Sequence, residues 1–263
     1  MRTGYCLGMA DYLDADLRGS RFENTDLSGT VLHAVDLSGS RFLAVDLTGA
    51  VMRGVDLVDV SIYGVVKNAT VNGVEIAPLI EAELDRRHPD RPKMRPTDPA
   101  GFAEAWELLG RLWDQTVERA RGLPPEALHE QVNGEWSFIE TLRHLVFATD
   151  AWIRRGILGD PSPWDALDLP WDEMPDTPGV PRDRSARPSL DEVLELRRDR
   201  QSTVAEVIGN LTETSLDDQT VVIDAPGWPP PKSFLVRQCL RVVLNEEWEH
   251  RLFAERDLDA LGY

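Results

Sequence analysis

The sequence has little lysine and little cysteine, and both shortages narrow the range of functions. Only three of its 28 basic residues are lysine, and the formal net charge is −18. Nonspecific nucleic-acid binding depends on clustered basic side chains that displace counterions, so no nucleic-acid partner is expected. The two cysteines, Cys6 and Cys239, are far apart in the chain and suggest no disulfide framework. A reducing cytoplasm is therefore the expected location.

Long apolar runs are missing as well. No uninterrupted stretch approaches the roughly 18–20 residues that a membrane span needs, so no membrane partner is expected. The first residues also lack the apolar segment and cleavage site of a secretory signal. Hydrophobic residues nevertheless make up 42% of the 263 residues. This content is enough for one large domain or two smaller ones.

A strict five-residue period runs through the first quarter of the chain. Neither the helical period near 3.6 nor the strand period of 2 produces it. A small or β-branched residue stands two places before each large apolar residue, and Leu7 and Tyr12 extend the register backward. The large apolar residues occupy every fifth position: Leu17, Phe22, Leu27, Leu32, Leu37, Phe42, Leu47, Met52, Leu57 and Ile62.

This pattern, with its Asp-Leu-Ser-Gly and Asp-Leu-Thr-Gly units, resembles the pentapeptide-repeat family. The resemblance implies a right-handed quadrilateral β-helix over residues 1–76, in which the large and the small residue point inward. Some pentapeptide proteins mimic DNA with columns of acidic residues. An ordinary solvated face is nevertheless the preferred interpretation of the aspartates in this chain. Five aspartates at ten-residue spacing would form the column: Asp16, Asp26, Asp36, Asp46 and Asp56.

The repeat gives way to a different kind of sequence after residue 66. Asn72-Gly73 predicts a turn and a closing hairpin, and a short helix is expected over about Ala77–Arg87. A linker rich in proline and charge follows, so residues 77–97 form the predicted boundary segment. Residues 98–263 form the predicted second domain.

The second domain shows helical periodicity. Four long amphipathic helices are predicted, and they suggest a four-helix bundle: Pro99–Arg121, Ser137 to about Gly156, Ser189–Gly209 and Ser233–Leu261. The connection Gly159–Pro188 is unusually long, so it is expected to be ordered over the bundle or functional.

Two ionisable residues in the last of these helices need an explanation. Glu246 and His250 stand one turn apart on a wedge that is otherwise apolar and that also holds Cys239. Buried ionisable side chains are rare unless they are paired or bind a metal. His144, in the second predicted helix, has small neighbours on its side of the helical wheel. It could therefore converge with Glu246 and His250 inside the bundle. The set therefore predicts a metal site, with a buried polar cluster as the alternative.

The arrangement of His144, Glu246 and His250 resembles the DinB-like superfamily of metal-binding four-helix bundles. Many members have His-x-x-x-His in the fourth helix, whereas this chain has Glu-x-x-x-His. The mycothiol-dependent maleylpyruvate isomerase branch is similar in this respect. The resemblance implies that the three residues ligate a divalent metal. A set of two histidines and one carboxylate suits Zn²⁺ best, and Fe²⁺ or Ni²⁺ are also possible.

The sequence shows no nucleophile elbow, no phosphate-binding loop and no Cys-x-x-Cys pair. No catalytic residue beyond the metal ligands is therefore predicted. The family resemblance, together with the ligand set, implies a thiol S-transferase. In this hypothesis the metal activates a low-molecular-weight thiol, such as mycothiol or bacillithiol, for attack on an electrophile. The alternatives are a non-catalytic interaction protein or DNA mimic that acts through the β-helix, and a metal-dependent hydrolase on the same bundle.

The remaining candidates have simpler explanations. Cys239 is expected to be a small buried hydrophobe. His33, His88 and His129 are expected at the surface. Four tryptophans on loops or helix starts could line a pocket: Trp136, Trp164, Trp171 and Trp228.

Overall fold

The computed structural model describes residues 11–262, so the proposed roles of Cys6 and Leu7 fall outside the described residues. The chain divides into two compact units between Gly54 and Val55. This division lies inside the five-residue repeat. The domain limits at residues 76 and 97 stay predictions. No helix in the described part of the chain is long and apolar enough to cross a membrane.

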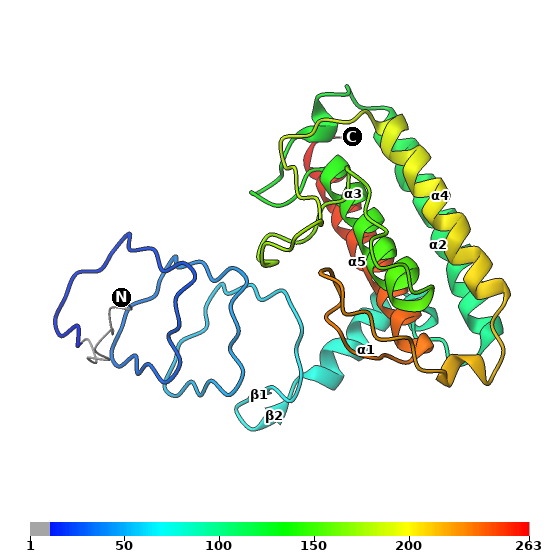
Figure 1. Ribbon diagram of the computed structural model, residues 1–263. Helices are drawn as coiled ribbons and strands as arrows, with labels where there is room; N and C mark the ends of the chain where they lie inside the picture. The colour runs from blue at the N-terminus through cyan, green and yellow to red at the C-terminus, as the bar shows by residue number, and fades with distance from the viewer. Residues whose placement is uncertain (1–10, 263) are drawn as a thin grey trace, which may run out of the picture. The chain divides into compact units, whose positions relative to one another are not determined.

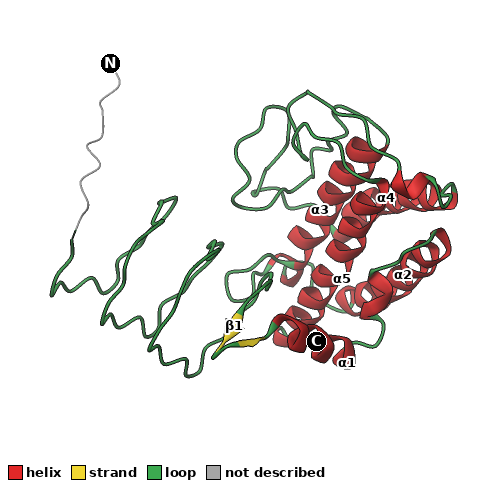
Figure 2. Cartoon of the chain, turned by 90° about the horizontal axis from the view of Figure 1, so that it is seen from below, coloured by secondary structure: helices red, strands yellow, loops and turns green. Residues whose placement is uncertain are grey.

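The backbone of the repeat has its own five-residue period. From Asp14 to Gly64, every fifth residue has a positive φ, which is the conformation that Gly, Asn and Asp adopt most readily. Turns closed by hydrogen bonds such as Ser20 N to Leu17 O, at 3.1 Å, recur every ten residues. The chain therefore winds as successive coils of loop (Figure 2).

The aspartates at ten-residue spacing support these turns. The carboxylate of Asp26 accepts a hydrogen bond from the backbone N–H of Ser28 at 2.9 Å. Asp36 and Asp46 likewise accept from the backbone N–H groups of Ser38 and Thr48. Short side chains that bond their own backbone in this way stabilise tight turns. The aspartate spacing thus has a local structural cause, which fits the preferred interpretation of a solvated face.

The expected inward burial of the large repeat residues is not found. Leu17 is 43% exposed and Phe22 is 60% exposed, and the other large residues of the register are exposed as well. The physical reason is that no hydrogen bond joins the backbones of adjacent coils between residues 11 and 64, so neighbouring coils do not cover these side chains. No strand is assigned between these residues, and a closed β-helix stays a prediction.

The hairpin and the short helix after the repeat are confirmed. Strands β1 (Thr70–Val71) and β2 (Val74–Glu75) pair antiparallel around Asn72-Gly73, whose φ values of 51° and 82° are those of a type I′ turn. Helix α1 (Ala77–Arg87) follows. The short 3₁₀ helix η1 (Arg91–Met94) then leads into the bundle.

Four long helices form the bundle, as the sequence predicts (Figure 1). They are α2 (Pro99–Arg121), α3 (Phe138–Thr149), α4 (Leu190–Gly209) and α5 (Val236–Ala260). The helix starts follow from local chemistry. Asp98 caps α2, and the capping boxes Ser137–Glu140 and Ser189–Glu192 begin α3 and α4.

The buried side chains of the bundle form separate clusters along its length. Phe102, Leu109, Val243 and Trp248 are buried in one cluster, and Trp113 joins a second. Trp113 and Trp248 are 3% and 4% exposed, and Trp106 is half-buried against the first cluster.

Helix α3 continues as the π-helix η3 (Asp150–Ile157), which extends the second predicted helix to its expected end. The connecting loop, residues 158–188, then runs over the bundle and buries Asp168, Leu169 and Met174. The 3₁₀ helices η2 (Ala127–His129) and η4 (Ser215–Asp217) complete the described elements.

Candidate metal centre

The three predicted ligands lie together between α3 and α5. His144 projects from α3, and Glu246 and His250 project from adjacent turns of α5. One ligand atom from each residue can be chosen so that all three atoms lie within 4.8 Å of one another. No other group of His, Cys, Asp and Glu in residues 11–262 has this metal-compatible geometry. The folded chain therefore brings the predicted set to one place.

Backbone carbonyls orient both imidazoles. Nδ1 of His144 lies 2.9 Å from the carbonyl oxygen of Leu169, and Nδ1 of His250 lies 2.9 Å from that of Glu246. A carbonyl oxygen only accepts hydrogen bonds, so each Nδ1 must carry the proton and donate it. In the neutral form of each ring, the lone pair therefore lies on Nε2. This is the arrangement that metal-ligating histidines commonly have.

The carboxylate of Glu246 completes the set. Its Oε2 lies 3.4 Å from Nε2 of His144 and 3.3 Å from Nδ1 of His250. A carboxylate oxygen that faces an imidazole lone pair across 3.4 Å is stabilised when a cation lies beside both atoms. The chemistry of the donors thus fits a divalent ion.

The local electrostatics favour the forms that bind metals. Burial, together with the nearby His144, lowers the pKa of His250 to about 4, so this imidazole is neutral near pH 7. Burial alone would raise the pKa of Glu246, but the hydrogen bond and charge of His144 lower it overall. Glu246 is therefore a carboxylate at neutral pH. Metal ligation requires these two states.

Aromatic side chains cover one side of the three ligands. The ring of Trp136 lies 4.5 Å from that of His144 and stacks on that of His250 at 5.9 Å, and its indole N–H donates to Asp172 at 3.0 Å. Phe147 lies 6.0 Å from His144. These rings limit the access of water to the imidazoles on that side.

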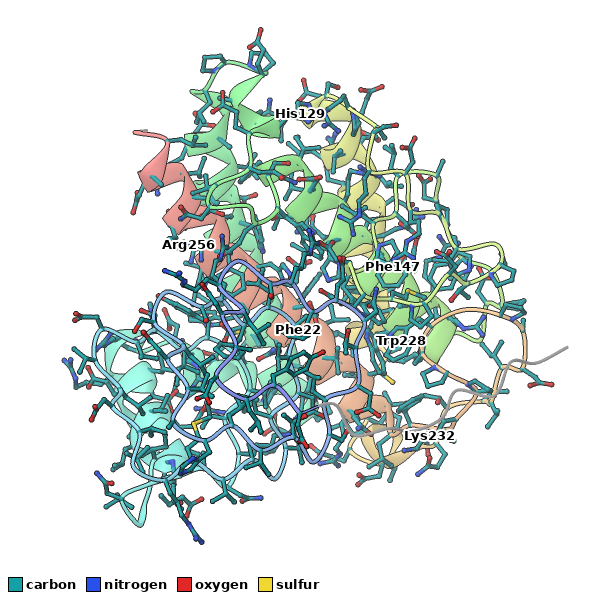
Figure 3. All side chains as sticks on the ribbon, turned by 90° about the vertical axis from the view of Figure 1, so that its left-hand side faces the viewer. Phe22, His129, Phe147, Trp228, Lys232 and Arg256 are labelled. Atoms are coloured by element: carbon teal, nitrogen blue, oxygen red, sulfur yellow. The ribbon has the colours of Figure 1, made fainter. Side chains whose placement is uncertain are left out.

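The other predicted pocket tryptophans form one packed cluster. Trp164 stacks on Phe147 at 5.6 Å, and Trp171 meets Trp228 edge-on at 4.8 Å. Phe147 and Trp228 lie in the same region of the bundle (Figure 3). The four predicted tryptophans therefore gather near His144, where they pack against other rings.

The structure contains a buried ion pair near the site that the sequence did not predict. Glu247 lies off the wedge of Glu246, yet its side chain is only 2% exposed because it accepts a hydrogen bond from Arg197 of α4 at 2.9 Å. The guanidinium of Arg197 also lies 5.0 Å from the ring of Trp113. The signal in the sequence is weak, since the partner is 50 residues away.

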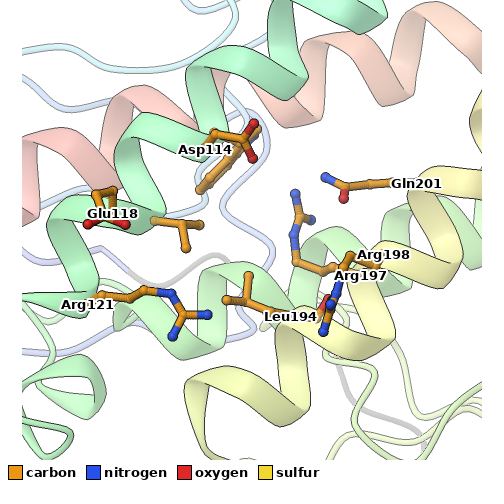
Figure 4. A pocket seen from close by; sticks show the side chains of 9 residues that line it. Asp114, Glu118, Arg121, Leu194, Arg197, Arg198 and Gln201 are labelled. Carbon is orange, nitrogen blue, oxygen red and sulfur yellow. The ribbon is translucent and has the colours of Figure 1, made fainter.

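Two hollows lie on the bundle surface. One lies between α2 and α4 and contains none of the three ligands, and each of its three arginines is paired with a carboxylate. Figure 4 shows its labelled lining: Asp114, Glu118, Arg121, Leu194, Arg197, Arg198 and Gln201. The other hollow follows α5 past Gln238 and Val242 and reaches Glu246. Of these two hollows, the second includes one candidate ligand, Glu246.

The remaining candidates lie apart from the ligand set. Cys239 is fully buried, and burial raises the pKa of its thiol to about 12, so it fits the predicted role of a small hydrophobe. His33 is exposed, as predicted. His88 and His129 are half-buried, and His88 lies edge-on to Trp248 at 6.2 Å. The last two are therefore less exposed than expected.

Comparison with known proteins matches two different families to two regions of the chain. The DinB superfamily matches residues 108–254, which include all three candidate ligands and more than half of the chain. Pentapeptide repeats, in eight copies, match residues 14–42. Both resemblances seen in the sequence are thus confirmed. No curated protein and no solved structure matches the chain.

Proposed function

This chain belongs to the DinB superfamily, whose members typically bind a divalent metal, and we propose that His144, Glu246 and His250 ligate that metal in a thiol S-transferase. The observation that carries the proposal is the orientation of the two imidazoles. Both Nδ1 atoms bond to carbonyls, so each imidazole keeps Nε2 for a metal, and one ligand atom from each of the three residues lies within 4.8 Å of the other two. Zn²⁺ suits this set best, and Ni²⁺ or Fe²⁺ are compatible with it.

Three protein ligands leave coordination positions open for a small molecule. The chemistry that a bound divalent cation supplies is the deprotonation of a coordinated thiol near neutral pH. Glu246 contributes the negative charge of the ligand set, and the two imidazoles contribute nitrogen donors. Trp136 and Phe147 exclude water on one side, which strengthens the electrostatic interactions of the site.

The attacking thiol is proposed to come from a small molecule. Cys239 cannot serve, because it is buried and its thiol has a pKa of about 12. The similarity of the Glu-x-x-x-His pair to the mycothiol-dependent isomerase branch supports mycothiol, and bacillithiol is the second cosubstrate to test. The hollow along α5 that reaches Glu246 offers a route for the thiol or the electrophile. The net charge of −18 favours small-molecule partners over nucleic acid.

Metal content tests the first step. The protein and a Glu246→Ala/His250→Ala double variant are purified in parallel and analysed for bound Zn, Ni and Fe. We expect about one metal per unsubstituted chain and strong depletion in the double variant. Glu249→Ala is the matched control, since it removes a carboxylate from the same turn of α5 outside the ligand set. Equal metal content in the double variant and the unsubstituted protein would overturn the assignment.

Thiol dependence tests the second step. The metal-loaded protein is incubated with an electrophile and with mycothiol, bacillithiol or no thiol, and the thioether product is measured. Product that forms only with a thiol, and not with the double variant, supports the transferase. Turnover of an ester or amide without any thiol would favour a hydrolase on the same ligands. Metal binding without turnover would favour a protein that acts through a partner docked on the repeat.

A further inference from the structure

Two neighbouring residues of α3 bond to the same short stretch of the connecting loop. His144 bonds to the carbonyl of Leu169, and Arg143 donates from Nε to the carbonyl of Leu167 at 2.8 Å. The two accepting carbonyls are two residues apart in the loop. The segment Leu167–Leu169 is therefore fixed to α3 by one ligand histidine and by the arginine that precedes it.

Arg143 also connects two distant parts of the loop. Its Nη2 donates to the carbonyl of Asp183 at 2.7 Å, in the part of the loop that leads to α4. The side chain is fully buried. Nη1 of this buried guanidinium has no hydrogen-bond partner among the described residues, so the carbonyls of Leu167 and Asp183 are the acceptors that offset its burial. Arg143 thereby holds the backbone that orients His144.

The same loop also positions the aromatic cover of the site. Asp172, three residues after Leu169, accepts the indole N–H of Trp136, and Arg182 donates to the carbonyls of Trp171 and Asp172. The loop is thus cross-linked within itself. Its connection to α3 next to the ligands depends on Arg143 and His144.

We infer that Arg143 is a positioning residue for the metal centre: by fixing the carbonyl of Leu169, it holds His144 with the proton on Nδ1 and the lone pair of Nε2 toward the ion. The inference rests on the proposed metal site. Without the carbonyl, a neutral imidazole populates both tautomers and rotates more freely, so fewer molecules present a ligand. Outer partners of metal-ligating histidines typically contribute about 10- to 100-fold to metal affinity.

The test compares three variants by Zn²⁺ titration against a chelating competitor. Arg143→Gln should bind Zn²⁺ about 10- to 100-fold more weakly than the unsubstituted protein. Arg143→Lys should fall between them, because an ammonium group can reach one carbonyl but cannot bridge two. Arg155→Gln is the matched control. Arg155 is equally buried and donates to carbonyls of Pro161 and Ala225, away from Leu169.

The second readout needs no metal. Heteronuclear NMR of the imidazole nitrogens in the metal-free protein should show His144 protonated on Nδ1 alone. Arg143→Gln should give a mixture of tautomers, and Arg155→Gln should not. Unchanged tautomer and unchanged Zn²⁺ affinity in Arg143→Gln would overturn the inference; if that variant does not fold, unchanged values in Arg143→Lys would do so. Failure of the proposed function would instead appear as no Zn²⁺ binding by the unsubstituted protein, and the tautomer would still decide the role of Arg143.

Discussion

The buried pair of Arg197 and Glu247 makes a quantitative prediction about stability. The two side chains are 4% and 2% exposed and are joined at 2.9 Å. Glu247→Met removes the carboxylate at similar volume and leaves the guanidinium buried without its counter-charge. Breaking one partner of such a pair costs about 3–5 kcal/mol. For a bundle of this size each kcal/mol corresponds to about 2–4 °C in Tm, so Tm should fall by at least about 6 °C.

Urea unfolding followed by tryptophan fluorescence measures this loss. All eight tryptophans lie between residues 106 and 248, so the signal reports on the bundle alone. The double variant Arg197→Met/Glu247→Met should recover most of the stability, because it buries no unpaired charge. Glu195→Met is the control, since its pair with Arg198 is exposed and its loss should stay within about 0.5 kcal/mol. A single variant that loses less than about 1 kcal/mol, or a double variant no more stable than the single one, would refute the reasoning.

Three further predictions concern the bundle. Cys239 should resist alkylation at pH 8 in the folded protein and react after denaturation, because burial raises the pKa of its thiol to about 12; peptide mass spectrometry separates it from Cys6, and rapid labelling of the folded state would contradict the assignment. Gly227→Ala should destabilise the bundle by about 1–3 kcal/mol in urea unfolding, since the new Cβ would lie 2.8 Å from Cζ of Arg155, whereas Gly179→Ala has open space and should cost about 1 kcal/mol; equal losses would argue against a steric cause. Ser137→Ala removes the capping hydrogen bond of α3 and should cost about 1 kcal/mol in the same assay; a loss below the experimental error would contradict this role.

The helices and the hairpin could be predicted because their signals are local. The capping boxes at Ser137 and Ser189 and the Asn72-Gly73 turn each act over a few residues, and each element occurs where its signal predicts. The convergence of the three ligands could be predicted from helical phase and from the family resemblance together. Neither source alone identifies which helices are neighbours.

Other features depend on contacts between distant parts of the chain. The burial of Glu247 is set by Arg197 of α4, and the wheel of α5 alone places this residue off the apolar side. The carbonyl of Leu169 is a backbone atom, and no residue type in the loop marks it as an acceptor for His144. In the repeat, the period predicts the positions of the turns, but covering the large residues requires contact between coils.

Because the acceptor for His144 is a main-chain carbonyl, nearly any residue type at position 169 would supply it. Selection in this part of the loop would then act on the backbone path and the loop length more than on the residue types. Point changes at Leu169 should be tolerated during divergence wherever the packing allows, whereas a deletion or insertion between Leu167 and Leu169 would shift the acceptor out of reach. Related bundles could thus keep the same centre with loops that share length and little else.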